Sequence, residues 1–498
     1  MTGKTGCGAA GRAMTALLCA AALTVYGAAA AQAVPAPAAD SSYSDADGTT
    51  WYVYTTNRSA DIAGQSGDHI QIGSGSGAGP TIYGNVYGAS GDAGVSGSAV
   101  SVDNSTVARK NRRDTKSGSV YGGFAMNGSV IGTAVNVNSS DVGADIFGGS
   151  AKSGDVQDNT VTVAGSSARY IYGGSTDRGS ASGNAVSVNS SDVGTDISGG
   201  SAKSGDVQDN TVTVAGSSAR YIYGGRTDGG SASGNTVTVE SSTVSIDISG
   251  GTAKSGDAHE NVVTATNSTV KSVYGGYASG DSGNALSNEV ILENVSVLQD
   301  VHGGVALYGS ASGNAVTVSS TDVKIYQIYG GAVESGDAEN NKVTLGNAEA
   351  GFIYGGYSQK SGDVKNNEVT LHGSSADYIL AGGLAAGSGD VSGNSLTLEN
   401  SDSENFAAGG LSMRGNAVGN SVNLSGSRAT IVLGAFVAAS GDVSGNTAAL
   451  ENSTASSLIG GRTVRGAAVS NGVTVRNSTV AAMCGEDTAS QVRRHMIQ

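Results

Sequence analysis

The sequence predicts an all-β protein that winds as a repetitive parallel β-helix, or β-solenoid, of about 15 coils of 25–28 residues, expected to be right-handed. Three observations predict this fold. An N-x-V-x-V alternation recurs at a nearly constant interval, a glycine landmark recurs with it, and no unit has a helical apolar period long enough for a helix. A left-handed β-helix or an open β-solenoid is the alternative, although its usual hexapeptide period is absent.

The first landmark is an asparagine that opens each alternating segment, with 25 to 27 residues between successive copies. Alternation with a period of two is the pattern of a strand with one buried face. We therefore expect the valines to point inward and the asparagines to stack as a hydrogen-bonded ladder at a corner of the coil. The landmark asparagines are Asn159, Asn184, Asn210, Asn235, Asn261, Asn288, Asn314, Asn341, Asn367, Asn394, Asn420, Asn446 and Asn471.

The second landmark is a glycine, usually the first of a Gly-Gly pair, that follows a short strand such as "RYIY". It recurs from Gly88 to Gly460 every 25 to 28 residues, except for a first step of 34 residues that contains a basic segment, residues 108–118. We expect these glycines to adopt backbone conformations that other residues resist, where each coil turns. The basic segment is interpreted as a solvated loop.

Stacking explains why the chain repeats itself so closely. Strands of about five residues cannot bury a face alone and must pack on the coils before and after, about 4.8 Å away. Residues 153–174 return unchanged as residues 204–225, so that the duplicated block of 51 residues equals two coils. "SGD" turns at Asp155 and Asp206 alternate with "SGN" at Asn184. We interpret this alternation as holding stacked carboxylates about 10 Å apart, where they repel each other less than at about 5 Å.

The pattern divides the chain into four regions. Residues 1–33 are predicted to be a signal peptide, residues 34–80 an N-terminal cap, residues 81–485 the β-helix repeats and residues 486–498 a tail without the repeat. No C-terminal cap is visible, and we interpret the chain as truncated there, with export to the cell surface by another route as the alternative.

The start of the chain has the features of a secretory signal. Lys4 and Arg12 precede an apolar run, and cleavage is expected after Ala31 or Ala33. The mature chain would then keep Cys484 as its single cysteine, which leaves no disulfide framework. The net charge of −15 and the isoelectric point near 4.7 disfavour nucleic acid as a partner, because phosphate binding needs clustered lysine and arginine.

No catalytic, cofactor-binding or metal-binding residues are expected. The "GDSG" tetrad at residues 280–283 matches the surroundings of a trypsin-like serine nucleophile, but it reads as two fused turn motifs, and the five histidines have unlike repeat contexts. Asp337, Asp363 and Asp390 fall in consecutive coils and could be bridged by Ca²⁺, but the nonapeptide pattern of calcium-binding β-rolls is missing. We therefore interpret them as turn residues.

A column of tyrosines is the candidate binding surface. Tyr121, Tyr172, Tyr223, Tyr274, Tyr329 and Tyr354 share one position of the repeat, directly before the glycine landmark. Alternation with inward isoleucines is expected to turn Tyr172 and Tyr223 outward, with Tyr170 and Tyr221 beside them. Surface tyrosines suit a glycan or a protein partner, although rings that only cover the edge of the coils are the alternative. The candidate ligand-binding residues are Tyr170, Tyr172, Tyr221, Tyr223 and Tyr274.

The secretory start, the units rich in Gly, Ser, Asn and Val with "YGG" and "SGN" at coil spacing, and the scarcity of cysteine resemble the passenger domains of bacterial autotransporter adhesins. The resemblance implies a β-helical stalk at the cell surface or outer membrane of a Gram-negative bacterium, which acts in adhesion or aggregation without catalysis. Its partners would be a host-cell surface, a glycan or copies of itself. The usual C-terminal translocator barrel is missing from this sequence. The alternative function is a β-helical polysaccharide lyase or hydrolase, which would need a local cluster of acids.

Overall fold

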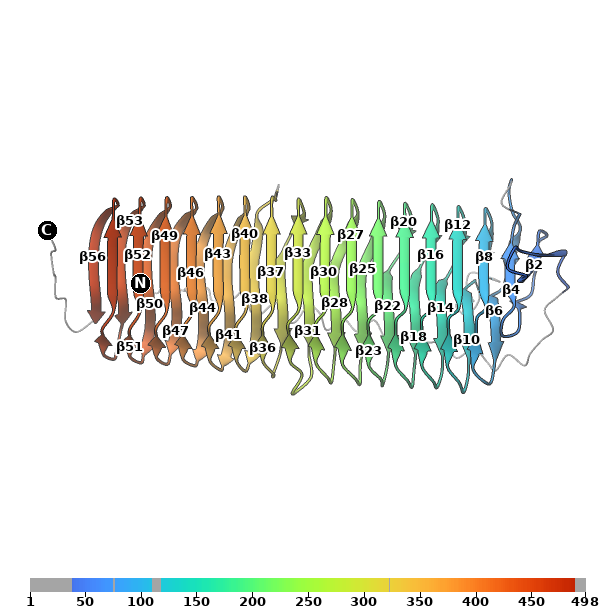
Figure 1. Cartoon of the computed structure of the whole chain (residues 1–498), viewed down its shortest axis with the longest axis horizontal. Helices are drawn as coiled ribbons and strands as arrows, with labels where there is room; N and C mark the ends of the chain where they lie inside the picture. The colour runs from blue at the N-terminus through green and yellow to red at the C-terminus, as the bar shows by residue number, and fades with distance from the viewer. Residues whose placement is uncertain (1–37, 75–76, 110–117, 322, 489–498) are drawn as a thin grey trace, which may run out of the picture.

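The computed structural model describes residues 38–74, 77–109, 118–321 and 323–488, and these wind into an all-β solenoid of about 16 turns without a helix (Figure 1). The predicted fold class is confirmed, with about one turn more than expected. The predicted signal peptide and residues 489–498 of the predicted tail lie outside the described residues. A search of the described residues for a helix long and apolar enough to cross a membrane finds none.

The coil that contains the first copy of the duplicated segment shows the order of elements. It runs through β15, β16, β17 and β18, and each strand pairs in parallel with the equivalent strand of the next coil. Three long sheets result, each running along the rod (Figure 1).

The first sheet contains the N-x-V-x-V strands. Its members are β1 (Ser41–Ser44), β2 (Thr50–Tyr54), β4 (His69–Ile72), β8 (Ala99–Asp103), β12 (Ala134–Asn138), β16 (Thr160–Ala164), β20 (Ala185–Asn189), β24 (Thr211–Ala215), β27 (Thr236–Glu240), β30 (Val262–Thr266), β33 (Glu289–Glu293), β37 (Ala315–Ser319), β40 (Lys342–Gly346), β43 (Glu368–His372), β46 (Ser395–Glu399), β49 (Ser421–Ser425), β52 (Thr447–Glu451) and β55 (Gly472–Arg476).

The second sheet contains the strands that carry the glycine landmark and the short strands before them. Its members are β3 (Ile62–Ala63), β5 (Thr81–Tyr83), β6 (Val86–Gly91), β9 (Thr106–Ala108), β10 (Val120–Ala125), β13 (Asp141–Val142), β14 (Asp145–Ala151), β17 (Ser167–Ala168), β18 (Tyr170–Thr176), β21 (Asp192–Val193), β22 (Asp196–Ala202), β25 (Ser218–Thr227), β28 (Thr243–Ala253), β31 (Thr269–Ala278), β34 (Ser296–Val297), β35 (Asp300–Ala306), β38 (Ile325–Ser335), β41 (Glu349–Ser361), β44 (Ser375–Ser388), β47 (Asp402–Arg414), β50 (Arg428–Ser440), β53 (Thr454–Thr463) and β56 (Thr479–Thr488).

The third sheet consists of two-residue strands. Its members are β7 (Val95–Ser96), β11 (Val130–Ile131), β15 (Val156–Gln157), β19 (Ala181–Ser182), β23 (Val207–Gln208), β26 (Ala232–Ser233), β29 (Ala258–His259), β32 (Ala285–Leu286), β36 (Ala311–Ser312), β39 (Ala338–Glu339), β42 (Val364–Lys365), β45 (Val391–Ser392), β48 (Ala417–Val418), β51 (Val443–Ser444) and β54 (Ala468–Val469).

The parallel stacking begins before residue 81, inside the region predicted as a cap. β2 pairs in parallel with β4, and β4 with β8, so that Ile70 and Ile72 lie in register with Val100 and Val102 of the first regular coil. These isoleucines are fully buried and continue the inward column without the asparagine landmark. β1, the first strand, is antiparallel to β2 and therefore interrupts the parallel stacking at this end.

The predicted asparagine ladder is confirmed and occupies the corner between the third and first sheets. Asn159 Nδ2 donates to Asn184 Oδ1 at 2.8 Å, and the same pattern continues to Asn471 with distances of 2.9 Å. The backbone N–H of Asn159 also donates to Asn184 Oδ1, at 3.1 Å, and its second Nδ2 hydrogen goes to the carbonyl of Val130, at 3.1 Å. Each amide is therefore fully hydrogen-bonded although it is excluded from water.

The corner between the first and second sheets holds a serine ladder that the sequence patterns did not predict. The backbone N–H of Ser140 donates to Ser166 Oγ at 3.0 Å, and that of Ser166 donates to Ser191 Oγ at 3.2 Å. Two interruptions are a buried valine, Val295, and Ala348. Serine is common in turns of any kind, so its frequency alone did not indicate a buried column.

The glycine pair is needed for close packing and not for unusual backbone angles. Gly148 and Gly149 are not among the residues with a positive φ. A Cβ on Gly148 would lie 2.4 Å from the carbonyl oxygen of Gly173 in the next coil, and one on Gly149 would lie 2.6 Å from Asn159 Nδ2. The expectation of special conformations at this pair was wrong, because the constraint comes from the neighbouring coil and the ladder.

The "SGD" turns are also aligned differently from the prediction. Asp155 stacks with Ser180 and not with Asn184, because the backbone N–H of Ser180 donates to Asp155 Oδ1 at 2.9 Å, while Asn184 belongs to the buried ladder. Asp206 in turn donates its N–H to Ser180 Oγ at 3.3 Å. Carboxylates alternate with neutral residues from Asp155 to Asp257, as expected, with serine as the intervening residue, but further along the same turn carboxylates follow one another in successive coils.

The acids considered for Ca²⁺ lie at this same turn. Asp337 Oδ1 accepts the N–H of Asp363 at 2.7 Å, and Asp363 Oδ1 accepts the N–H of Asp390 at 2.9 Å. Lys365 adds an ion pair with Asp363 at 2.9 Å. These carboxylates join successive turns through backbone N–H groups, as in the turn interpretation.

Candidate ligand-binding face

The second sheet bends outward at the glycine pair, which brings side chains before and after the pair together on the outside of the rod. Tyr121 and Phe124 are three residues apart and would point to opposite faces of a straight strand. Their rings nevertheless lie 5.9 Å apart, and those of Tyr274 and Tyr277 lie 6.0 Å apart. The glycine pair therefore forms a concave strip with side chains on both flanks.

Two columns of side chains line this strip. The Tyr column lies directly before the glycine pair and consists of Tyr87, Tyr121, Phe147, Tyr172, Ser198, Tyr223, Ser249, Tyr274, His302, Tyr329, Tyr354, Ala381, Ala408, Leu433, Ile459 and Cys484. The Asp column lies two residues earlier and begins with Asp145, Tyr170, Asp196, Tyr221, Asp247, Ser272 and Asp300.

The predicted exposure of the tyrosines is corrected by the structure. Tyr172 is only 7% exposed, while Tyr170, Tyr221, Tyr223 and Tyr274 are half-buried. None of the five belongs to the interior core cluster, so they face outward but are covered by one another. The physical reason is coil spacing, because rings stacked about 5 Å apart leave only an edge in contact with water.

The structure brings the candidate tyrosines together as pairs and not as one continuous patch. Tyr170 and Tyr172 have ring centroids 6.1 Å apart, and Tyr221 and Tyr223 have centroids 5.9 Å apart. Ser198 lies between the two pairs in the Tyr column. The pairs therefore recur every second coil, as the duplicated block requires.

Arginines cover the outer edges of these pairs. Arg169 lies 4.7 Å from the centroid of the Tyr170 ring, and Arg220 lies 5.9 Å from that of Tyr221. Arg226 lies 5.5 Å from the Tyr223 ring. Each contact is a cation–π interaction that holds the ring in place.

The Asp column contains acids that the sequence patterns did not single out. Asp145, Asp196, Asp247 and Asp300 occupy alternate coils, and burial raises the pKa of each to about 6, against the opposing effect of nearby arginine or lysine. The Oδ1 atoms of three of them, Asp145, Asp196 and Asp300, are buried without a hydrogen-bond partner. In the sequence they resemble the many turn aspartates. The signal that distinguishes them is their repeated position before the glycine pair, as in "DIFGG", "DISGG" and "DVHGG".

His302 continues the Tyr column and stacks between Tyr274 and Tyr329, with ring centroids 4.9 and 4.8 Å apart. Burial lowers the pKa of His302 to about 3, so the ring is neutral at physiological pH. A neutral, stacked imidazole adds to the ring column. It has no acid or nucleophile as a hydrogen-bond partner among the described residues.

The protease-like tetrad has no triad around it. Ser282 lies in the turn between β31 and β32. The four described histidines have other neighbours: His69 packs on Trp51, His259 lies beside Glu260, His302 stacks in the Tyr column, and His372 pairs with Glu399. Among the described residues, no group of three or more histidines, cysteines or acids could hold a metal ion.

Comparison with models of protein families, with curated proteins and with solved structures gives no match for this chain. Its function is therefore inferred from the arrangement of its own residues. The strip offers aromatic edges, hydrogen-bond acceptors and cations in a pattern that repeats along the rod.

Proposed function

We propose that this chain is an exported, surface-displayed β-helical stalk that acts in adhesion or aggregation without catalysis, similar to an autotransporter passenger domain. The observation that carries the proposal is the unbroken in-register stacking of the first sheet from β2 to β55. A solenoid in which each coil contacts only its neighbours forms an extended rod and offers a long outer surface for contacts.

The outer surface supports this proposal through its repetition. A tyrosine pair with an arginine occurs twice, two coils apart, at Tyr170 and Tyr221. Weak contacts that recur along a rod add up when the partner is also repetitive, such as a glycan, a cell surface or a second rod. The proposed partners are the host-cell surface, a glycan or the chain's own copies, and the proposed place of action is the surface of a Gram-negative cell.

The test is an adhesion assay with the mature chain coupled to beads. Beads that carry the chain should adhere to epithelial cells or clump with one another well above beads that carry a β-solenoid of similar charge without the tyrosine pairs. Adhesion and clumping no greater than those of the control beads would contradict the proposed function.

A polysaccharide lyase or hydrolase is the second candidate, and one observation favours it. Acids with a pKa of about 6, such as Asp196 and Asp247, lie two coils apart, a separation of about 10 Å. Inverting glycosidases use one carboxyl group with a raised pKa and hold the pair about 6.5–9.5 Å apart, so the raised pKa fits this function while the spacing here lies just above that range. Release of new reducing ends from a polysaccharide by the chain, lost in Asp196→Asn, would establish this function in place of the first.

A further inference from the structure

A trough on the outside of the rod, far along the chain from the candidate tyrosines, carries a second binding proposal. Two hollows of about 580 and 700 Å³ share Asp402, Glu404 and Arg428 and so form one elongated depression. It begins near Lys324, before β38, and ends at Ala481 in β56. We call this depression the trough.

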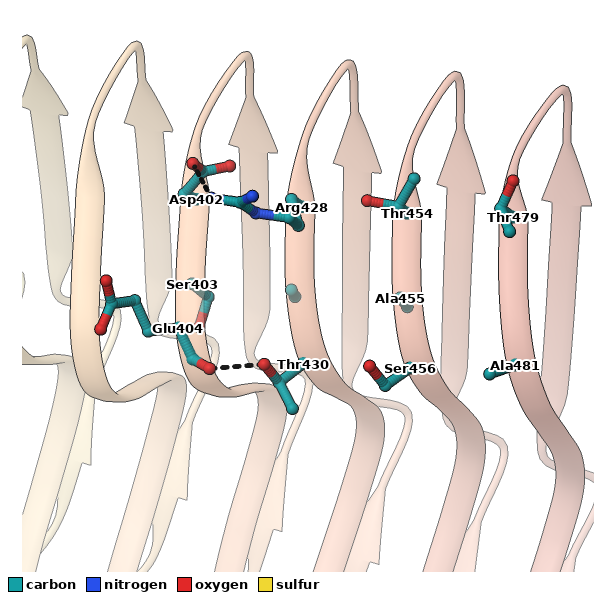
Figure 2. A pocket seen from close by; sticks show the side chains of 11 residues that line it. Asp402, Ser403, Glu404, Arg428, Thr430, Thr454, Ala455, Ser456, Thr479 and Ala481 are labelled. Atoms are coloured by element: carbon teal, nitrogen blue, oxygen red, sulfur yellow. Dashed lines mark hydrogen bonds and ion pairs between the residues drawn. The ribbon is translucent and has the colours of Figure 1, made fainter.

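The walls of the trough are two rows of side chains that run along the rod, across the strands. Figure 2 shows one row formed by Asp402, Arg428, Thr454 and Thr479, and a second formed by Glu404, Thr430, Ser456 and Ala481. The residues between the rows, Ser403, Ala429 and Ala455, are small and buried. Ala429 and Ala455 belong to the interior core, so the bottom of the depression between the rows is formed by strand backbone.

The local repeat is altered where the trough runs. The register shifts between Ala350 and Phe352 where β41 pairs with β44, and between Ser403 and Phe406 where β47 pairs with β50. A β-bulge adds a residue to one strand and redirects its side chains. Register shifts at the equivalent place also occur where β25 pairs with β28 and where β28 pairs with β31, so the trough lies on a kind of bulge that recurs along the second sheet.

Polar groups in the walls can both donate and accept hydrogen bonds. Arg428 pairs with Asp402 at 3.0 Å, which fixes both side chains. Thr430 Oγ1 donates to the carbonyl oxygen of Glu404 at 2.5 Å, as Figure 2 shows. The carboxylates of Glu349 and Glu404 have no ion-pair partner in the part of the chain that the structure describes, and they give the trough a net negative charge.

An exposed aromatic ring lies beside the trough, in β44, although it lines neither hollow. Tyr378 is 47% exposed, packs on Phe352 with ring centroids 4.8 Å apart, and has Lys324 Nζ 5.1 Å from its ring. A Cβ on Gly351 would lie 3.3 Å from the Tyr378 ring, so the glycine provides the space in which the ring rests. Lys324 also pairs with Asp377, which holds it beside the ring.

The geometry points to a linear, neutral polysaccharide that lies in the trough along the rod axis. Equivalent wall positions recur once per coil, about every 4.8 Å along the rod. An extended peptide places side chains on the same face about every 6.6 Å, so its side chains would not match the spacing of the wall positions. Unpaired Glu349 and Glu404 disfavour sulfated or uronate polymers, since like charges repel. Sugar hydroxyls can donate to these carboxylates and accept from Arg428, and the apolar face of a sugar ring can cover Tyr378.

This inference names a ligand class for the proposed adhesive function. It rests on that function in one respect, namely that the trough is exposed outside the cell. The probes are neutral unbranched hexasaccharides with β-1,4 or β-1,3 linkages, the corresponding monosaccharides, and heparin as a polyanion, each titrated calorimetrically into the mature full chain. A hexasaccharide should bind, and the monosaccharide and heparin should not. Binding of heparin alone, or of no hexasaccharide, would overturn the inference.

The variants test the site itself. Tyr378→Ala and Glu404→Gln should each weaken hexasaccharide binding roughly tenfold, the loss of one good contact. Tyr308→Ala is the matched control, because Tyr308 is 49% exposed and lies between β35 and β36, outside the trough. Unchanged thermal unfolding of all three variants shows that folding is intact. Equal affinity of Tyr378→Ala, Glu404→Gln and the parent would overturn the assignment.

The two proposals can fail separately. In one outcome, beads carrying the parent and beads carrying the Tyr378→Ala, Glu404→Gln double variant adhere equally to cells, and neither protein binds a hexasaccharide. The adhesive function then stands and the trough assignment fails. If the parent binds the hexasaccharide and the double variant does not, but neither adheres to cells, the trough assignment stands and the adhesive function fails.

Discussion

The inner corner with the asparagine ladder and the outer Tyr column are built on the same coils but differ in how far their residues vary. From Asn159 to Asn471 the ladder position is asparagine in every coil. Over the same coils the Tyr column changes from tyrosine to serine, histidine, alanine, leucine, isoleucine and cysteine. The difference shows that a position is restricted to one residue type when its side chain makes directional hydrogen bonds to the next coil. Stacking alone does not restrict the residue type.

Within the ladder asparagine is retained because each amide uses its hydrogen-bonding groups on both sides, whereas Thr133 occupies the position where the ladder begins and donates to Asn159 Oδ1. Asn314 accepts from Asn288, donates to Asn341 and donates to the carbonyl of Ala285, and it is fully buried. A residue without a planar amide would leave partners on both sides unsatisfied. A ring in the Tyr column makes only contacts that another apolar side chain can replace.

The largest effect is expected from breaking the ladder. Asn314→Ala should lower the free energy of unfolding by about 4 kcal/mol, because it leaves two donors of Asn288 and the carbonyl of Ala285 buried without partners. The measurement is denaturant unfolding followed by circular dichroism. The control is Asn423→Ala, at an exposed position of β49, which should change the same free energy by less than about 0.5 kcal/mol. Equal effects of the two substitutions would contradict the role of the ladder.

A smaller effect is expected from the Asp column, and it depends on pH. Burial raises the pKa of Asp196 to about 6 from its ordinary 3.8, so the folded chain holds this proton more tightly than the unfolded chain. The stability that this proton contributes is present below about pH 4 and is lost as pH rises through 6, a change of up to about 3 kcal/mol. The parent should therefore unfold more easily at pH 8 than at pH 5.

Asp196→Asn should reduce this pH dependence and raise the unfolding midpoint at pH 8. Asp281→Asn, at an exposed turn position, is the control and should leave the pH profile unchanged. A parent whose stability does not fall between pH 5 and pH 8 would show that the carboxylate is better solvated than its burial indicates.

The smallest effect is expected in the Tyr column. Tyr172→Ser should cost about 1–2 kcal/mol of unfolding free energy, because Tyr172 is buried and stacks on Phe147 at 5.1 Å. Tyr223→Ser should cost less, since its neighbours in the column are already Ser198 and Ser249. Thermal unfolding of the two variants gives the comparison. A greater loss for Tyr223→Ser would mean that Arg226 and Tyr221 hold this ring more strongly than coil stacking holds Tyr172.

The sequence was sufficient for the inner features of the fold. Asn159 and Val161 were assigned correctly because their spacing fits one coil per repeat. In that arrangement the amide of Asn159 is hydrogen-bonded to the next coil and the side chain of Val161 is buried. Ser166 was missed because a turn serine and a ladder serine have the same sequence context. Gly148 was found, but its reason was misjudged, since the atom that excludes a side chain belongs to the next coil.

The outer surface could be predicted only in part. Alternation correctly indicated that Tyr172 lies outside the core, but it did not indicate that Phe147 of the preceding coil covers its ring, with ring centroids 5.1 Å apart. Asp196 was hidden among many turn aspartates. Tyr378 lies at a β-bulge, where the repeat shifts by a residue, so its position in the pattern gave no sign of its exposure beside the trough.

The most direct test of this division between an inner framework and an outer binding surface is to measure the unfolding midpoint and hexasaccharide binding on the same samples of the parent, Asn314→Ala and Tyr378→Ala. We predict that Asn314→Ala lowers the midpoint and leaves the affinity of the folded molecules unchanged, while Tyr378→Ala weakens binding roughly tenfold at an unchanged midpoint. A Tyr378→Ala variant that unfolds as early as Asn314→Ala and still binds like the parent would contradict this division.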